Sequence, residues 1–513
     1  MNTKIRQQLA ARKRRIARRL DKFKLGDCSR PVLASPNVHY ELAERTQGIC
    51  YGGLGLIQLL VRRLGLAQAI DRRLHLLKVH LPYHESDHVL NFAYNALCDG
   101  TCLEDMELRR NDAAFLDALG ARRIPDPTTA GDFCRRFQPQ DVRTLLDILH
   151  EVRQRAWSEQ PSEFFAEARI DMDGTLVPTT GECKEGMDIS YNGVWGYHPL
   201  VVSLANTGEV LSVVNRSGNR PSHEGAADEV DRVLRVCFDG GFQKVLLRGD
   251  ADFTQTTRLD DWNADERVRF IFGMDCMPNL HVLADDLPRS AWKTLERPPR
   301  YAVKTQPRTR PQNVKERIVR ERAFRNIRLE SEEVAQFAYR PTACKETYRM
   351  VVVRKNLAIE QGQKRLLDDY RYFFYLTNDR RLSAEEVVFL ANDRCDQENL
   401  HAQLKGGVRA LQAPIDGLVS NWAYMVMTSL AWNLKAWLAL ALPEPTGRWA
   451  ERHGQQKRTL LRMEFKKFIN ELIRVPCQIV RGGRRLVYRL LAWNRWQDVF
   501  FRALDALSLS LRC

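Results

Sequence analysis

Residues 168–173 read ARIDMD, and here the pattern of the chain changes from helical to stranded. Apolar and charged residues alternate with the two-residue period of a β-strand. Ile170 and Met172 therefore face one side, while Asp171 and Asp173 face the other. We expect a strand that presents two carboxylates together near its end.

The residues that follow alternate strands with helices. A hairpin is predicted around Asn206-Thr207-Gly208, and helical spacing at 226–236 precedes an apolar run that stops at Asp250. A basic, Pro- and Arg-rich segment then interrupts this alternation, which resumes at 372–376. The strands expected before the interruption lie at 168–173, 200–204, 210–214, 245–247 and 268–272. This order of elements is typical of an α/β protein.

Ser383 and Glu386 form a capping box, which predicts the start of a long helix that runs through Lys405. Side chains spaced by four, three and four residues share one face of this helix. They are Arg394, Glu398, His401 and Lys405. One acid among cations suits a metal ligand flanked by groups that grip phosphates. The alternative is a surface helix with ordinary Arg–Glu pairing between neighbouring turns.

Asp173, Asp250 and Glu398 can meet only if their two strands are neighbours and the helix packs across them. That arrangement is a ribonuclease H-like core. Three carboxylates from different elements suffice to hold two Mg²⁺ or Mn²⁺ ions, because these hard cations prefer oxygen ligands and keep several waters. Two such ions clamp the attacking and leaving oxygens when a phosphodiester bond is cut or transferred. The sequence therefore predicts catalytic and metal-binding roles for all three residues.

The balance of charge indicates a nucleic-acid partner. The chain of 513 residues has 79 Lys and Arg against 64 Asp and Glu, a net charge of +15. Each phosphate that a protein neutralises releases condensed counterions, so a basic chain suits double-stranded DNA. The basic segment at 1–24 has helical spacing and fits either an arm for DNA or a solvated charged helix. Individual candidates for DNA contacts are Arg135, Arg136, Arg308, Arg310, Arg394 and Lys405.

Export and membrane insertion are not expected. The N-terminus lacks the apolar segment of a secretory signal. The most apolar long stretch, 423–442, carries Asn433 and Lys435, which favours a buried core helix over a bilayer span. The twelve cysteines are scattered, and no pair has the two-residue separation of common zinc or redox motifs. This pattern indicates free thiols in a reducing compartment, so we expect a cytoplasmic protein.

Changes in composition predict five successive regions. In the first, Arg135 and Arg136 end a short helix that is either a DNA recognition helix or a core helix with a basic rim. A basic β-rich insertion divides the α/β core in two. The regions are 1–160 (helical and DNA-binding, with the basic arm), 161–275 (first part of the core), 276–365 (insertion), 366–445 (second part of the core) and 446–513 (basic and helical).

Several of these motifs resemble those of bacterial insertion-sequence DDE transposases of the group 1 type. Arg394, Glu398 and Lys405 match the last three positions of the family's Tyr-(2)-Arg-(3)-Glu-(6)-Lys signature, but Ala391 stands at the Tyr position. Asp173-Gly174-Thr175 looks like the family's Asp-x-Thr. Further similar motifs are Arg248-Gly249-Asp250-Ala251-Asp252-Phe253, Gly196-Tyr197-His198-Pro199-Leu200, Gly218-Asn219-Arg220 and Gly52-Gly53-Leu54. The resemblance covers about residues 50–442.

The resemblance implies an enzyme that cleaves the ends of an insertion sequence and joins the freed 3′-hydroxyl to target DNA. It also implies a β-rich insertion between the second Asp and the Glu, a homodimer or larger oligomer that pairs two ends, and a bacterial, nucleoid-associated protein. It favours Asp173 over Asp171 as the first metal ligand, because Asp173 matches the Asp-x-Thr motif. Asp252 is not expected to be a ligand, and the alternative for it is a helix N-cap.

Two other functions fit the same sequence. A related nuclease with the same core would cut DNA without joining it. A non-catalytic DNA-binding repressor or scaffold, descended from a transposase, would bind without chemistry. The presence of Asp173, Asp250 and Glu398 together argues against the non-catalytic function.

Overall fold

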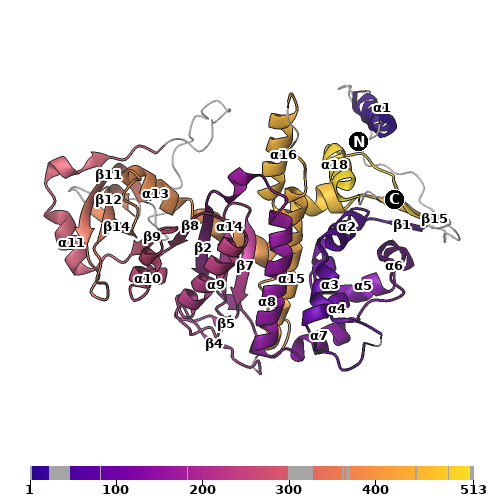
Figure 1. Cartoon of the computed structure of the whole chain (residues 1–513), viewed down its shortest axis with the longest axis horizontal. Coiled ribbons are helices and arrows are strands. Elements are labelled where there is room, and N and C mark those ends of the chain that lie inside the picture. Colours follow the sequence, from indigo (N-terminus) through magenta and orange to yellow (C-terminus); the bar gives the residue numbers. More distant parts are fainter. Residues whose placement is uncertain are drawn as a thin grey trace.

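The centre of the molecule is a single large mixed sheet. The computed structural model describes residues 3–21, 47–80, 82–181, 183–297, 327–360, 363–364, 370–444, 447–482 and 485–508. Within them, ten strands form one sheet in the order β10-β11-β12-β14-β9-β8-β2-β6-β7, with β13 paired to β12. Helices α8 and α15 stand beside β7, and helices α2–α7 lie beyond them (Figure 1). This architecture confirms the predicted mixed α/β class.

Five strands form the half of the sheet that includes both predicted carboxylate-bearing strands. They are β2 (Ala168–Gly174), β6 (Leu200–Leu204), β7 (Glu209–Val214), β8 (Val245–Gly249) and β9 (Val268–Met274). β2, β8 and β9 are parallel neighbours, whereas β6 and β7 pair antiparallel on the other side of β2. Every residue of β8 is buried, as expected for an apolar strand covered on both faces. The strands predicted in this part of the chain are confirmed.

The β-rich residues that follow extend the same sheet. β14 (Tyr370–Thr377) pairs antiparallel with β9, so that Phe374 lies opposite Met274. Figure 1 shows these strands continuing outward from the core, next to α11 (Pro278–Asp285). The other strands of this part are β10 (Lys293–Thr294), β11 (Ile327–Tyr339), β12 (Tyr348–Glu360) and β13 (Gln363–Lys364). The core and the β-rich segment therefore share one continuous hydrogen-bonded sheet.

Helices make up most of the first region. They are α1 (Thr3–Asp21), α2 (Leu54–Leu64), α3 (Leu66–Arg73), α4 (Glu85–Leu97), α5 (Asp105–Arg110), α6 (Ala113–Leu119), α7 (Pro127–Arg135) and α8 (Pro139–Trp157). Further elements surround the core strands: β3 (Val177–Pro178), β4 (Asp188–Ile189), β5 (Trp195–Tyr197), α9 (Ala226–Asp239) and α10 (Leu259–Ala264). β3, β4 and β5 form a small sheet of their own, in the order β3-β5-β4.

The C-terminal region contains a hairpin that the prediction of a helical region did not include. Its helices are α16 (Ala450–Leu461), α17 (Phe465–Phe468) and α18 (Gln497–Leu507). Between them, β15 (Cys477–Gly482) and β16 (Arg485–Leu490) pair with each other, and β15 also pairs with β1 (Gln47–Ile49). Gly53 follows β1, and a Cβ atom there would lie 1.8 Å from the carbonyl oxygen of Leu472. The hairpin depends on residues from the start of the chain, which no local pattern reveals.

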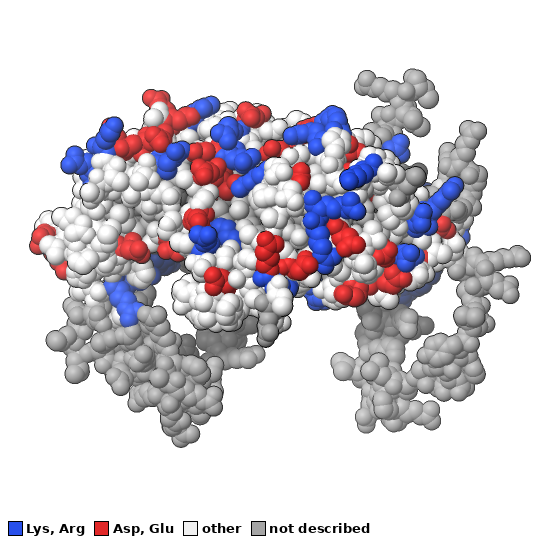
Figure 2. Space-filling model, turned by 90° about the horizontal axis from the view of Figure 1, so that it is seen from below, with Lys and Arg blue, Asp and Glu red and all other residues white. Residues whose placement is uncertain are grey.

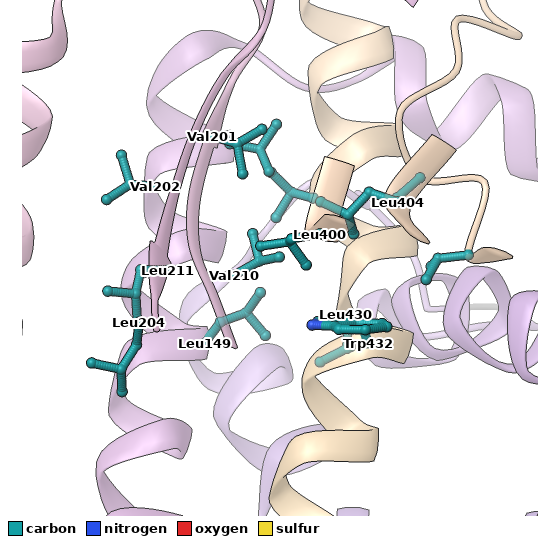
Figure 3. Close-up of a cluster of buried hydrophobic side chains, with 14 of the residues drawn as sticks. Leu149, Val201, Val202, Leu204, Val210, Leu211, Leu400, Leu404, Leu430 and Trp432 are labelled. Atoms are coloured by element: carbon teal, nitrogen blue, oxygen red, sulfur yellow. The ribbon is translucent and has the colours of Figure 1, made fainter. Parts of the chain in front are cut away.

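Helix α15 (Leu418–Leu440) packs along the sheet as the central buried helix. Val201 and Val210 point from the sheet toward Leu430 and Trp432 of α15, while Val202, Leu204 and Leu211 point to the opposite face (Figure 3). The polar side chain of Asn433 can be buried because its amide accepts a hydrogen bond from the N–H of Val210 and donates one to the C=O of Val210, each at 2.9 Å. In the described part of the chain, no helix is long and apolar enough to cross a membrane.

Lys435 caps the end of a neighbouring helix from within the core. Its Nζ donates to the carbonyl oxygens of Leu461 at 2.9 Å and Met463 at 2.7 Å, and lies 3.6 Å from the centre of the Trp432 ring. Lys435→Met would leave both carbonyls without this donor. We expect a loss of about 2–4 kcal/mol in the free energy of unfolding, measured by urea denaturation, because each buried unpaired polar group costs roughly 1–3 kcal/mol.

The matched control for that prediction is Lys466→Met. Lys466 is largely exposed and makes only a 3.8 Å ion pair with Asp99. Its replacement should change the free energy of unfolding by less than about 1 kcal/mol. Equal stability of the two variants would show that the buried carbonyls do not depend on Lys435.

Candidate active site

Two carboxylates converge at one edge of the sheet. β2 and β8 are parallel neighbours, so their C-terminal ends lie side by side. Asp173 is the next-to-last residue of β2, and Asp250 directly follows β8. The guanidinium of Arg394 bridges them, with Nη1 3.3 Å from Oδ2 of Asp173 and Nη2 3.6 Å from Oδ2 of Asp250. The structure therefore places one cation between the first two predicted ligands.

The surroundings make this pair of carboxylates costly to ionise. Burial raises the pKa of Asp173; with Arg394 opposing this effect and the charge of Asp250 adding to it, the pKa is about 6. Burial also raises the pKa of Asp250, with Asp252 adding to the effect and Arg394 opposing it. Two ionised carboxylates that are close together and partly shielded from water are stabilised by a cation between them.

Close packing of the chain fixes the position of Asp250. Its Oδ1 accepts a hydrogen bond from the backbone N–H of Asp252 at 3.1 Å and so caps the short turn Ala251–Phe253. A Cβ atom on Gly273 would lie 2.8 Å from the backbone nitrogen of Ala251, so this turn can rest on β9 only because Gly273 lacks a side chain. The helix-capping role considered for Asp252 thus belongs to Asp250, and Asp252 itself is exposed.

Asp171, the alternative first ligand, has a different partner. Both of its oxygens accept hydrogen bonds from Arg248, from Nε at 2.7 Å and Nη2 at 2.8 Å. Asp171 is 1% exposed and Arg248 is 2% exposed. The geometry therefore favours Asp173 as the available carboxylate on this strand.

The predicted helix through Lys405 begins as expected but is not continuous. Ser383 and Glu386 form the predicted capping box at the start of α13 (Ala384–Asn392). The chain then turns at residues 393–394, continues as α14 (Cys395–Ala402) and ends in a π-helical turn, Gln403–Gly407. The prediction of one long helix is wrong because its two halves pack on different neighbours. Val387 and Val388 of α13 join a cluster with Leu246 and Ile271, whereas α14 packs on β2 and β6.

Helix α14 is fixed to the sheet by both polar and apolar contacts. The buried side chain of Gln397 donates to the carbonyl oxygen of Val201 at 3.2 Å and accepts from the hydroxyl of Ser203. Figure 3 shows Leu400 and Leu404 in the same apolar cluster as Val201. These contacts hold Arg394 over the ends of β2 and β8.

Two further basic side chains lie along α14 and the turn that follows. Burial, together with the charges of Lys405 and Arg394, lowers the pKa of His401 to about 4. Burial also lowers the pKa of Lys405, against the opposing charge of Asp173. His401 therefore lies near Arg394 and Lys405, and Lys405 lies near Asp173.

Glu398 does not join Asp173 and Asp250. It is exposed on α14, and within the described residues no three His, Cys, Asp or Glu side chains lie close enough together to hold a metal ion. Of the three carboxylates that were expected to come together, Asp173 and Asp250 do so in the structure. Arg394, at the start of α14, pairs with both carboxylates, whereas Glu398 lies one turn further along the helix and is exposed.

Ala391, which occupies the Tyr position of the signature, lines a cavity of about 370 Å³ beside Asp250. Asp250 and Arg394 form part of the same wall, and Tyr375 of β14 lines the cavity from the sheet. An aromatic ring is therefore present in this cavity, but it comes from a different element.

His198 is a neighbour of the site to which the sequence assigned no role. Its Nδ1 lies 2.9 Å from the carbonyl oxygen of Arg220, and it is 5% exposed. A Cβ atom on Gly174 would lie 2.7 Å from Nε2 of His198, so the glycine after Asp173 makes room for the imidazole. The sequence drew attention to His198 only through the motif Gly196-Tyr197-His198-Pro199-Leu200, which resembles a family motif. The motif did not predict that His198 lies next to Gly174.

The candidate DNA contacts in the first region have different surroundings. Both arginines are exposed at the end of α7, and Arg135 pairs with Asp132 at 2.9 Å and with Asp416 at 3.1 Å. Arg308 and Arg310 lie outside the described residues. On the face shown in Figure 2, Lys and Arg are interspersed with Asp and Glu, so the positive charge does not gather into one patch there.

Comparisons with known proteins give one family and a distant structural likeness. The family described as Transposase DDE domain group 1 matches residues 49–511. No curated protein matches the chain. Among solved structures, a cryo-EM structure of the piggyBac transposase synaptic complex with hairpin DNA is 10% identical in sequence, with a TM-score of 0.33. That likeness covers 81% of this chain and 88% of the other.

Proposed function

The chain belongs to the transposase DDE domain group 1 family, and on this premise we propose that it cleaves the ends of an insertion sequence and joins them to target DNA. The main support for the proposal is that Asp173 and Asp250 lie together at the ends of adjacent parallel strands, where both carboxylates pair with the guanidinium of Arg394. Strand transfer pairs two element ends, so the active form is a dimer or larger oligomer on double-stranded DNA.

The order of strands supports a ribonuclease H-like core. In β7-β6-β2-β8-β9, the antiparallel strands β7, β6 and β2 are followed by β8 and β9, which run parallel to β2. Such a sheet delivers the two aspartates to the same edge. The β-rich strands then separate the second aspartate from α14 in sequence while they continue the sheet in space.

The residues at this edge fit a hard divalent cation. Mg²⁺ is usually held by one or two carboxylates, with water and substrate phosphates completing its octahedron. Asp173 and Asp250 supply two oxygens that already face one positive group. We assign Glu398 as a third ligand that would allow a second ion. Bound Mg²⁺ or Mn²⁺ would activate the attacking oxygen and stabilise the leaving oxygen.

Arg394 and Lys405 would bind the phosphates of the DNA strand at this edge. The contacts of Arg394 with the carboxylates, at 3.3 and 3.6 Å, are longer than ordinary charge-assisted hydrogen bonds. A guanidinium held this loosely can turn from the carboxylates to a phosphate, which it can contact through two N–H groups. Lys405 lies near Asp173 and would act as a point charge.

An assay of the whole chain tests the proposed function. The substrate is linear DNA that carries candidate element ends, supplied with Mg²⁺ or Mn²⁺ and a target plasmid. We expect metal-dependent release of a 3′-hydroxyl at the element end and then its covalent joining to the plasmid. Cleavage without joining would instead favour a nuclease, and DNA binding without metal-dependent chemistry would favour a repressor or scaffold.

Magnesium should stabilise the protein in a pH-dependent way. The folded-state pKa of Asp173 is about 6, above its ordinary value, so stability is lost as the pH rises through about 6 and the carboxylate ionises. A divalent cation binds the ionised form and offsets this loss. We expect saturating Mg²⁺ to raise Tm by about 2–4 °C at pH 8 and by less at pH 5, measured by scanning calorimetry.

Asp173→Asn is the control, because it removes the ionisable group and should remove most of this difference between the two pH values. An equal effect of Mg²⁺ at pH 5 and pH 8 in the unaltered chain would contradict cation binding by Asp173.

A further inference from the structure

A buried ion pair joins the two strands that carry the proposed metal ligands. Asp171 of β2 and Arg248 of β8 are opposite each other in the parallel register and form two charge-assisted hydrogen bonds, at 2.7 and 2.8 Å. Both side chains are almost fully buried. A buried ion pair is rarely a net gain in stability over well-packed apolar side chains, because both charges lose their hydration. Its presence here calls for a role other than stability.

The location of the pair indicates that role. Asp171 is two residues before Asp173, and Arg248 is two residues before Asp250. The third nitrogen of the Arg248 guanidinium, Nη1, donates to the carbonyl oxygen of Leu390 at 2.9 Å, near the end of α13. The chain then turns at residues 393–394 and brings Arg394 to both carboxylates. One buried guanidinium on β8 therefore connects β2 with α13, the helix that precedes the turn to Arg394.

We propose that Asp171 and Arg248 are positioning residues, which set the separation of Asp173 and Asp250 for a divalent cation and fix the turn before α14. This inference rests on the proposed function, because it assigns Asp173 and Asp250 as metal ligands. Neither member of the pair would be a metal ligand. Because Arg248 occupies both oxygens of Asp171, Asp173 is the carboxylate of this strand that remains available to a metal ion.

Two variants separate positioning from stability. Arg248→Lys keeps the positive charge but cannot reproduce two parallel bonds to Asp171 and a third to Leu390. The double variant Asp171→Leu with Arg248→Met removes both charges and leaves apolar side chains of similar size, which usually preserves stability. The matched control is Arg269→Met. Arg269 of β9 pairs with Glu167 and Asp379 at the opposite edge of the same sheet.

The measurements are Tm and the Kd for Mn²⁺, determined by titration calorimetry on the whole chain without DNA. We expect both variants to keep Tm within a few degrees of the parent while the Kd for Mn²⁺ rises about 10- to 100-fold, the usual effect of removing a group that orients metal ligands. The control should change the Kd by less than about twofold, since it leaves the ligand edge intact.

Each contrary result has a distinct meaning. Variants that bind Mn²⁺ within twofold of the parent would overturn the positioning role and leave the proposed function standing. A double variant that unfolds would assign the pair to stability and likewise overturn the inference. A parent chain that binds no Mn²⁺ and shows no metal-dependent cleavage would overturn the proposed function, and the inference with it.

Discussion

Asp173→Asn and Asp250→Asn should each lower the rate of metal-dependent DNA cleavage by at least about 10³-fold, equivalent to roughly 4 kcal/mol of transition-state stabilisation. Asparagine has nearly the same shape as aspartate but lacks the negative charge that a hard cation needs. Both positions are partly buried beside Arg394, so the change leaves the phosphate-binding cations in place. DNA binding, measured by gel shift at fixed salt, should therefore change by less than about threefold, because contacts to phosphates dominate affinity.

Asp252→Asn is the matched control for these two variants. Asp252 is exposed and follows Asp250 by two residues, and it contributes to the capped turn through its backbone N–H, which the variant retains. Cleavage by Asp252→Asn should stay within about threefold of the parent, because exposed charges act weakly. If Asp173→Asn and Asp252→Asn cleave equally well, Asp173 and Asp250 are not the catalytic carboxylates.

The same assay decides the role of Glu398. Its exposed position on α14 is compatible with a ligand recruited when metal and DNA bind, and also with a plain surface residue. Under the proposed function, Glu398→Gln should lose cleavage as the two aspartate variants do. Cleavage that survives this change would restrict the metal site to Asp173 and Asp250.

Glu209→Ala should destabilise the fold by about 3–5 kcal/mol, because it leaves a buried arginine without its counter-charge. Glu209 begins β7 and is fully buried. Its carboxylate accepts hydrogen bonds from Arg153 at 3.0 Å, Trp157 at 3.0 Å and Trp437 at 2.7 Å. It thereby joins α8 and α15 to the edge of the sheet. The free energy of unfolding from urea denaturation measures the effect.

Two comparison variants make this result specific. Glu224→Ala removes an exposed partner of Arg220 and should cost less than about 1 kcal/mol. The double variant Arg153→Met with Glu209→Leu removes both buried charges and should recover much of the lost stability. A loss below about 1 kcal/mol for Glu209→Ala would show that water reaches Arg153 in the folded protein.

Local patterns in the sequence were sufficient to locate the elements that carry the site. The alternation around Asp173 has the period of a strand, and the apolar run before Asp250 has the composition of a buried one. Ser383 and Glu386 marked the start of α13 through a capping interaction between residues three apart. The polar Asn433 in an apolar run correctly indicated a buried helix. Each of these signals depends on residues that are close in the chain.

Other features depend on partners that are distant in the chain. Both oxygens of Asp171 accept hydrogen bonds from Arg248, and Arg394 at the start of α14 pairs with the two carboxylates while Glu398 is exposed. The strand β15 pairs with the distant strand β1, and Arg135 is held by Asp416. A periodic pattern determines which face of an element is apolar, but it does not specify what that face meets.

The sequence by itself therefore determined the α/β class, the strands that end at Asp173 and Asp250, and the resemblance to DDE transposases. The tertiary structure alone decided which carboxylates come together, which arginine lies between them and which pair holds the strands in register. The reason is physical: strand and helix periods are set by neighbouring residues, whereas the separation of two carboxylates is set by packing between elements that the sequence does not place side by side.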